Sequence, residues 1–100
     1  MFIVQLKFAS NKSRAGEFME GHKAWLQRGF DDGVFLLAGS LQPKDQEAGG
    51  GGIVAHNTSR ADLERRVAAD PFVAEGVVTA EITEMAPSRA DARLDFLLAG

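Results

Sequence analysis

The chain has 100 residues, 45 % of them hydrophobic, which suits one domain with a single buried core and leaves no room for a second domain. Its formal net charge of −3 argues against binding to a nucleic-acid backbone, and the absence of cysteine excludes disulfides and thiolate zinc sites. No basic segment precedes the first apolar run, and no stretch reaches the roughly 18 apolar residues of a membrane span, so we expect a cytoplasmic protein that does not bind membranes.

Two periodic segments open the chain. In residues 2–8 every second side chain is apolar, which is the period of a half-buried antiparallel strand. From Arg14 to about Phe30 the apolar residues recur at steps of three and four, which predicts an amphipathic helix with Ser13 as its N-cap. The apolar stripe of this helix comprises Ala15, Phe18, Met19, His22, Trp25, Leu26 and Gly29, and the opposite side carries Arg14, Glu17, Glu20, Lys23 and Gln27.

The middle of the chain predicts two more strands and a second helix. Residues 34–41 are apolar enough for a strand buried on both faces, residues 43–52 are predicted to form a loop, and residues 53–56 a short strand. Ser59 and Asp62 form a capping box for a helix over residues 60–69. Pro71 ends that helix, because the residue before a proline is disfavoured in the α region. Alternating apolar and polar residues predict a last strand over 77–85.

This order of strands and helices predicts an α+β domain over residues 1–86. The simplest arrangement places both helices on one face of a four-stranded sheet and leaves the other face uncovered. The alternating residues Phe2, Val4, Leu6 and Phe8, with the apolar strand over 34–41, provide more apolar surface than two short helices can bury. We therefore expect a homodimer.

Residues 87–100 are predicted to form a C-terminal helical extension. Ser88 and Asp91 are suited to cap it. One side of this segment is apolar and comprises Ala90, Leu94, Leu97 and Leu98. Because an isolated helix of this length is marginal in water, we expect it to pack on its own dimer or on a neighbouring one.

The most informative polar residue is His22, because it lies within the apolar stripe of the first helix, where a buried imidazole needs a hydrogen-bond partner. Taken alone, it is more often a core or interface histidine bound to a backbone carbonyl. Asp70 likewise has a structural interpretation as the cap of a short turn whose first helical residue is Pro71. The two interpretations are compatible, since a capping carboxylate has further lone pairs to offer a histidine.

Several segments together resemble the YciI-like (YCII-related) proteins. They are Gly-His-Lys-Ala-Trp-Leu at 21–26, Gly33 followed by Ala-Gly-Ser at 38–40, the glycine run before Ile53, and Asp-Pro-Phe-Val-Ala-Glu-Gly-Val at 70–77. The resemblance covers residues 1–86 and implies a ferredoxin-like βαββαβ sandwich that dimerises sheet to sheet as a dimeric α/β barrel. It also implies an active site built on His22 and Asp70, whose carboxylate would orient the imidazole for general acid or base chemistry. The family implies no settled reaction, although some relatives are associated with the breakdown of aromatic compounds, including chloride elimination from hydroxylated rings. This chain departs from the family at Ser40, where a proline often follows the glycine.

Three functions follow as hypotheses. The first is an enzyme for a small, aromatic or carbonyl-bearing metabolite, with His22 and Asp70 as catalytic residues and Ser40, Trp25 and Phe72 as substrate-binding residues. The second is a homodimer that binds a ligand or serves as an accessory protein without catalysis. The third is a plain structural dimer with a satisfied core histidine.

Other kinds of site are not supported by the sequence. The run Gly49–Gly52 leads into a strand, and no Gly-Lys-Ser/Thr follows it, so it is better explained as a hairpin connection than as a phosphate loop. The two histidines lie at no helix-pair spacing, and we predict no metal and no cofactor. The order of elements also matches RNA-recognition domains, but residues 53–55 lack the exposed aromatics that such a domain uses.

Overall fold

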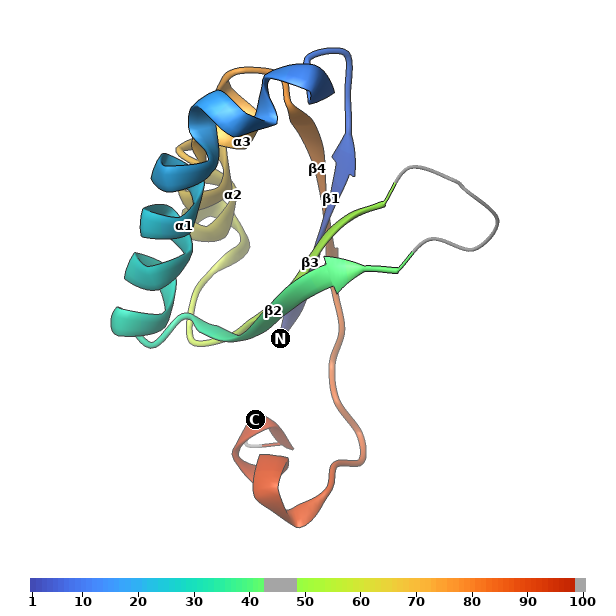
Figure 1. Cartoon of the computed structure of the whole chain (residues 1–100). Coiled ribbons are helices and arrows are strands. Elements are labelled where there is room, and N and C mark those ends of the chain that lie inside the picture. Colours follow the sequence, from blue (N-terminus) through green and yellow to red (C-terminus); the bar gives the residue numbers. More distant parts are fainter. Residues whose placement is uncertain (43–48, 99–100) are drawn as a thin grey trace.

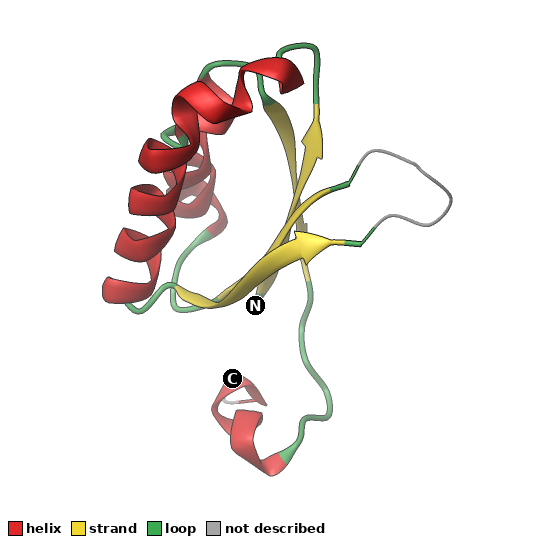
Figure 2. Cartoon of the chain, in the orientation of Figure 1, coloured by secondary structure: helices red, strands yellow, loops and turns green. Residues whose placement is uncertain are grey.

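Four strands pair into one antiparallel sheet in the order β2-β3-β1-β4, with helices packed on one of its faces (Figures 1 and 2). The structure is a computed structural model that describes residues 1–42 and 49–98. Its elements are β1 (Phe2–Phe8), the 3₁₀ turn η1 (Lys12–Arg14), α1 (Ala15–Asp31), β2 (Phe35–Leu41), β3 (Gly50–Ala55), α2 (Arg60–Ala68), the one-turn helix α3 (Pro71–Ala74), β4 (Val78–Glu84) and the 3₁₀ helix η2 (Ala92–Leu98). The predicted α+β class and the predicted order of strands and helices are confirmed.

Strand β1 lies in the middle of the sheet and supplies the centre of the core. Its alternating residues Phe2, Val4 and Leu6 are buried under the helices. Val4 lies opposite Ile53 of β3 and Ile82 of β4, so one apolar row crosses three strands. The two-residue period in the sequence therefore identified the face of β1 that packs against the helices.

Helix α1 begins later than the sequence predicted. Ser13 lies inside the 3₁₀ turn, where the backbone is already hydrogen-bonded, and no side chain caps the helix at its N-cap residue Arg14. The predicted N-cap at Ser13 is therefore wrong. Near its other end, α1 approaches the sheet closely at the buried Gly29, where an added Cβ would overlap the ring of Phe35. Only glycine permits this approach.

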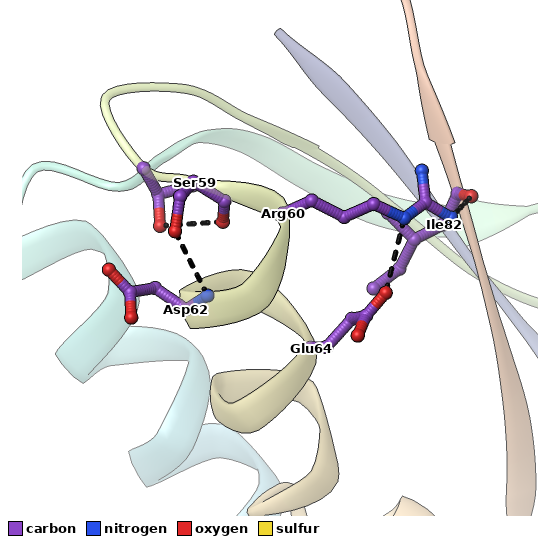
Figure 3. Close-up of polar contacts among 6 residues, drawn as sticks. Ser59, Arg60, Asp62, Glu64 and Ile82 are labelled. Atoms are coloured by element: carbon purple, nitrogen blue, oxygen red, sulfur yellow. Dashed lines mark hydrogen bonds and ion pairs between the residues drawn. The ribbon is translucent and has the colours of Figure 1, made fainter.

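Helix α2 is held at its start by polar contacts on two sides. The hydroxyl of Ser59 accepts a hydrogen bond from the Asp62 backbone N–H at 3.1 Å (Figure 3). The Asp62 carboxylate pairs with Arg65 instead of Ser59, so only half of the predicted capping box forms. Arg60 donates to Glu64 at 3.1 Å and to the Ile82 carbonyl at 3.0 Å, and the second bond fixes α2 against β4 (Figure 3).

Strand β3 is longer than the sequence predicted. Gly50, Gly51 and Gly52 belong to the strand and pair with Lys7, Leu6 and Gln5 of β1. The predicted loop is therefore wrong for these glycines, while residues 43–48 of that prediction lie outside the described part of the chain. Glycine has a low preference for strands, and pairing with β1 on one side and β2 on the other overrides it here.

The second face of the sheet is covered by no helix among residues 1–42 and 49–98 (Figure 1). Strand β2 is buried only at Phe35 and exposed from Leu37 to Leu41, so the prediction that it is buried on both faces is wrong for the single chain. Ile3, Leu37 and Leu41 are 39 %, 58 % and 40 % exposed, and strand alternation places them on this uncovered face with Val54. The apolar surface expected there from Phe2, Val4 and Leu6 instead faces the helices. We call Ile3, Leu37, Leu41 and Val54 the outer patch.

The C-terminal segment is helical over fewer residues than predicted. It forms the 3₁₀ helix η2 from Ala92, and Ser88 precedes it without helical structure. Its apolar side chains Leu94, Phe96 and Leu98 are exposed, and the Phe96 ring lies 5.6 Å from the ring of His56. Hydrogen bonds from the Arg93 side chain and backbone lower the pKa of Asp91 at the start of η2. Packing of this segment on a second chain stays a prediction.

Candidate active site

A cavity of about 320 Å³ lies between α1, α3 and the covered face of the sheet. Helix α1 contributes four residues to it, in two pairs whose members are four residues apart, so that the members of each pair are neighbours on the helix surface. They are Met19, His22, Lys23 and Leu26. The remaining wall is formed by Leu6, Phe8, Ala38, Gly39, Ser40, Gly50, Gly51, Gly52, Ile53, Phe72 and Val78. Most of these side chains are apolar, so the cavity suits a small, largely apolar ligand.

The cavity exists because small residues occupy the middle of the sheet. Gly51 of β3 lies between Leu6 of β1 and Ser40 of β2, on the face that the helices cover. A Cβ added at Gly51 would meet the Leu6 side chain at 3.7 Å, which is ordinary van der Waals contact. A larger residue would therefore fit at this position, and its absence leaves the space open.

Asp70 is positioned by the turn between α2 and α3. Its backbone is extended, Pro71 occupies the first helical position, and its carboxylate Oδ1 accepts a hydrogen bond from the Phe72 backbone N–H at 3.0 Å. This is the N-cap role that the sequence predicted. Unlike most capping residues, Asp70 is fully buried.

His22 binds the same carboxylate oxygen. Its Nδ1 lies 2.8 Å from Asp70 Oδ1, and its side chain is 13 % exposed at the wall of the cavity. An ionised carboxylate only accepts, so Nδ1 carries the proton and Nε2 keeps its lone pair when the ring is neutral. The pairing therefore fixes one tautomer and leaves Nε2 as the nitrogen for a ligand.

Aromatic contacts hold the imidazole in this orientation. The ring of His22 stacks on Phe72 with centroids 4.1 Å apart and planes 5° apart. Trp25 lies farther along α1, with its ring centre 5.9 Å from that of His22. The second carboxylate oxygen of Asp70, Oδ2, is buried and has no hydrogen-bond partner among the described residues. Both bonds that order the site thus converge on a single oxygen atom.

Three of the five residues predicted for the site, His22, Ser40 and Phe72, line the cavity; Asp70 lies buried behind His22, and Trp25 does not line the cavity. Trp25 is 2 % exposed, donates from Nε1 to the Arg66 carbonyl at 2.9 Å and packs edge-on against Phe35. It belongs to the core behind His22. Ser40 and Phe72 line the cavity as expected.

Other lining residues were not identified from the sequence. Met19 and Leu26 belong to the same stripe as His22, three residues before it and four after it, and this spacing was the available signal. Lys23 was expected on the solvent side of the helix, and its long side chain reaches the cavity nevertheless. Gly51 was not identified because the sequence predicted a loop over residues 43–52.

The described residues contain no group of three or more His, Cys, Asp or Glu side chains that could hold a metal ion. In the same part of the chain no helix is long and apolar enough to cross a membrane. What the cavity does offer is one oriented imidazole, one ammonium group, one hydroxyl and apolar walls. These groups can bind a small ring and transfer a proton to or from it.

Comparison with known proteins places the fold. The profile of the YCII-related domain matches residues 1–86. No curated protein matches the chain. A similar solved structure is 5-chloro-2-hydroxyhydroquinone dehydrochlorinase from Burkholderia phenoliruptrix AC1100 in complex with 2,5-dihydroxybenzoquinone. Its TM-score is 0.64 and its sequence identity is 14 %, and the match covers 85 % of this chain and 93 % of the dehydrochlorinase. Another is a mutant of SnoaB, a cofactor-independent oxygenase from Streptomyces nogalater, with a TM-score of 0.50 and 15 % identity, covering 89 % and 92 %. These similarities show a shared small α+β fold.

Proposed function

The chain belongs to the YCII-related domain family, and we propose that it is a small-molecule enzyme in which His22 and Asp70 perform general acid–base chemistry on a ring or carbonyl-bearing metabolite. The observation that carries this proposal is the 2.8 Å contact between His22 Nδ1 and the buried Asp70 carboxylate at the wall of a cavity. A purely structural histidine would need no access to a cavity, whereas His22 lines one.

The proposed chemistry follows from the two ring nitrogens. Nε2 of His22 takes a proton from a substrate in the cavity, and the imidazolium that forms is stabilised by the Asp70 carboxylate at Nδ1. Nε2 then returns the proton to the product or to water. Asp70 also holds the ring in place, since the Phe72 N–H and the stacked Phe72 ring fix both partners. Such oriented proton transfer contributes typically about 100- to 10,000-fold in rate.

The shape and lining of the cavity support a small ring as the substrate. Phe8, Leu26 and Phe72 provide apolar walls, and the Ser40 hydroxyl supplies a hydrogen-bonding group on the sheet side. The two similar structures, a dehydrochlorinase bound to a dihydroxybenzoquinone and an oxygenase that needs no cofactor, agree with chemistry that side chains perform on a small molecule.

We further propose that the active form is a cytoplasmic homodimer joined through the uncovered sheet faces. The outer patch exposes Leu37 and Leu41 on a surface flattened by Gly39 and Gly52, which carry no side chains to keep a second sheet apart. A two-fold contact would cover the same patch on both chains.

The test uses 2,5-dihydroxybenzoquinone as a ligand and halogenated hydroquinones as candidate substrates. Wild-type protein should bind the quinone and turn over a member of the series, and His22→Gln should lower turnover by about 100-fold or more. His56→Gln is the matched control, because His56 contacts Phe96 and does not line the cavity. Equal turnover in His22→Gln and the control would refute catalysis by this pair. Binding without turnover, lost in His22→Gln, would favour the non-catalytic ligand-binding alternative.

A further inference from the structure

Lys23 is the one lysine or arginine that lines the cavity in the described part of the chain. Within those residues it forms no ion pair. Its charge contrasts with the chain as a whole, which carries a formal net charge of −3. The part of the cavity lining that the structure describes therefore carries one basic side chain and no acidic one.

Lys23 and His22 approach the cavity from different sides of α1. Consecutive residues of an α-helix are about 100° apart around its axis. His22 is turned towards α3, where it contacts Asp70 and Phe72. Lys23 thus lines the cavity from the neighbouring part of the helix surface and does not compete for the partner of the imidazole. One ligand could contact both groups at once.

Among residues 1–42 and 49–98, no carboxylate lines the cavity beside Lys23. Asp70 is fully buried behind His22, and its Oδ1 is already bound to His22 and the Phe72 N–H. A second ammonium group, that of Lys12, lies 4.9 Å from the ring centre of the cavity residue Phe8. Lys23 is an exposed residue, so water screens part of its attraction for an anion, and the apolar walls reduce that screening only on the side of the ligand that they cover.

We propose that Lys23 selects ligands that carry an anionic oxygen, so that the cavity takes a small planar ring bearing a carboxylate or phenolate group. This inference rests on the proposed function, whose substrate class it narrows. Lys23 is a specificity-determining residue in this account: its ammonium binds the anionic oxygen, and the apolar walls hold the ring beside His22. Ser40, a hydroxyl from β2 that lines the same cavity, can donate a second hydrogen bond to that oxygen.

Two nearly isosteric probes that differ in charge test the proposal. Benzoate is an anion at neutral pH and benzamide is neutral, and neither requires turnover. Binding of each is measured by calorimetry to wild-type protein, Lys23→Met, Lys23→Arg and the control Arg28→Met, which removes the same charge from an exposed position of the same helix. Wild type, Lys23→Arg and Arg28→Met should prefer benzoate. Lys23→Met should bind benzoate about tenfold or more weakly and benzamide nearly unchanged, the size expected for a hydrogen bond to a charged group.

Three results would overturn the proposal. They are equal binding of the two probes to wild type, an undiminished preference for benzoate in Lys23→Met, and no saturable binding of either probe. A fourth variant, His22→Gln, separates this proposal from the catalytic one. If the preference for benzoate survives in His22→Gln, it resides in Lys23 whether or not His22 catalyses a reaction. If His22→Gln lost the preference for benzoate while Lys23→Met retained it, the preference would belong to the imidazole, and the role of Lys23 would be refuted.

Discussion

Replacing Asp70 by alanine removes two hydrogen bonds at a fully buried position. The bond from the Phe72 N–H, at 3.0 Å, is an N-cap, and losing such a cap costs typically about 1 kcal/mol. The bond from His22 Nδ1, at 2.8 Å, involves a charged acceptor and contributes about 1.5–3 kcal/mol. Together they predict a loss of about 3 kcal/mol in the free energy of unfolding. That is a large share of the roughly 5–15 kcal/mol by which small domains are stable.

Urea unfolding of three variants at one protein concentration separates the two contributions. Ser59→Ala removes only a cap, since the Ser59 hydroxyl accepts from the Asp62 N–H at an exposed site, and should cost about 1 kcal/mol. Asp70→Asn keeps a carbonyl oxygen that can accept both bonds, but its NH2 group replaces the buried Oδ2, which has no partner among the described residues, so we expect a cost of about 1–2 kcal/mol. Asp70→Ala should lose clearly more than either. If Asp70→Ala cost no more than Ser59→Ala, the bond to His22 would contribute nothing to stability and the reasoning would fail.

Three further changes test other parts of the account. Gly29→Ala should destabilise the fold by about 1–3 kcal/mol, because the added methyl group would overlap the ring of Phe35. The control Gly16→Ala places its methyl group in open space and should leave the stability unchanged, which thermal unfolding of the two variants would test. Gly51→Val should leave the fold intact and abolish binding of ring ligands by filling the cavity, and calorimetry showing unchanged affinity would count against the assigned ligand position. Leu37→Lys should convert a dimer into monomers in analytical ultracentrifugation by placing charge in the outer patch, and a monomeric wild type would remove the dimer proposal.

Local patterns predicted most of the fold because they report directly on one element. The alternation of Phe2, Val4 and Leu6 marks the buried face of β1, since strand side chains point to opposite faces in turn. The Asp70-Pro71 pair marks a capped helix start, because proline suits the first helical position. These signals need no knowledge of distant contacts.

The predictions that failed depend on contacts between distant segments. Gly50–Gly52 look like a loop, and only pairing with β1 and β2 makes them a strand. Trp25 and His22 share one apolar stripe, and the stripe alone cannot separate a core residue from one that lines a cavity. Ser13 has the right chemistry for a cap, but it lies inside a 3₁₀ turn in which backbone N–H groups already donate to backbone carbonyls.

The candidate site was predictable as a pair of residues but not as a cavity. His22 was notable as a polar residue in an apolar stripe, and Asp70 through the turn and the family resemblance. The cavity beside them depends on which small residues of β2 and β3 lie opposite α1, which is a matter of strand register. Lys23 was also not predicted as a cavity residue, because a helical period gives the side of the helix on which a residue lies but not how far its long side chain extends.

The most direct test of the proposed site is the tautomer of His22, read from long-range nitrogen–proton correlations of its ring by NMR under conditions where the ring is neutral. The account predicts a proton on Nδ1 and a bare Nε2, because the Asp70 carboxylate at 2.8 Å can only accept. Its Nε2 signal should also shift when benzoate binds, while the signals of His56 should not. A His22 ring protonated on Nε2, or one that ignores the ligand, would contradict the central claim that Asp70 presents His22 to the cavity as a base.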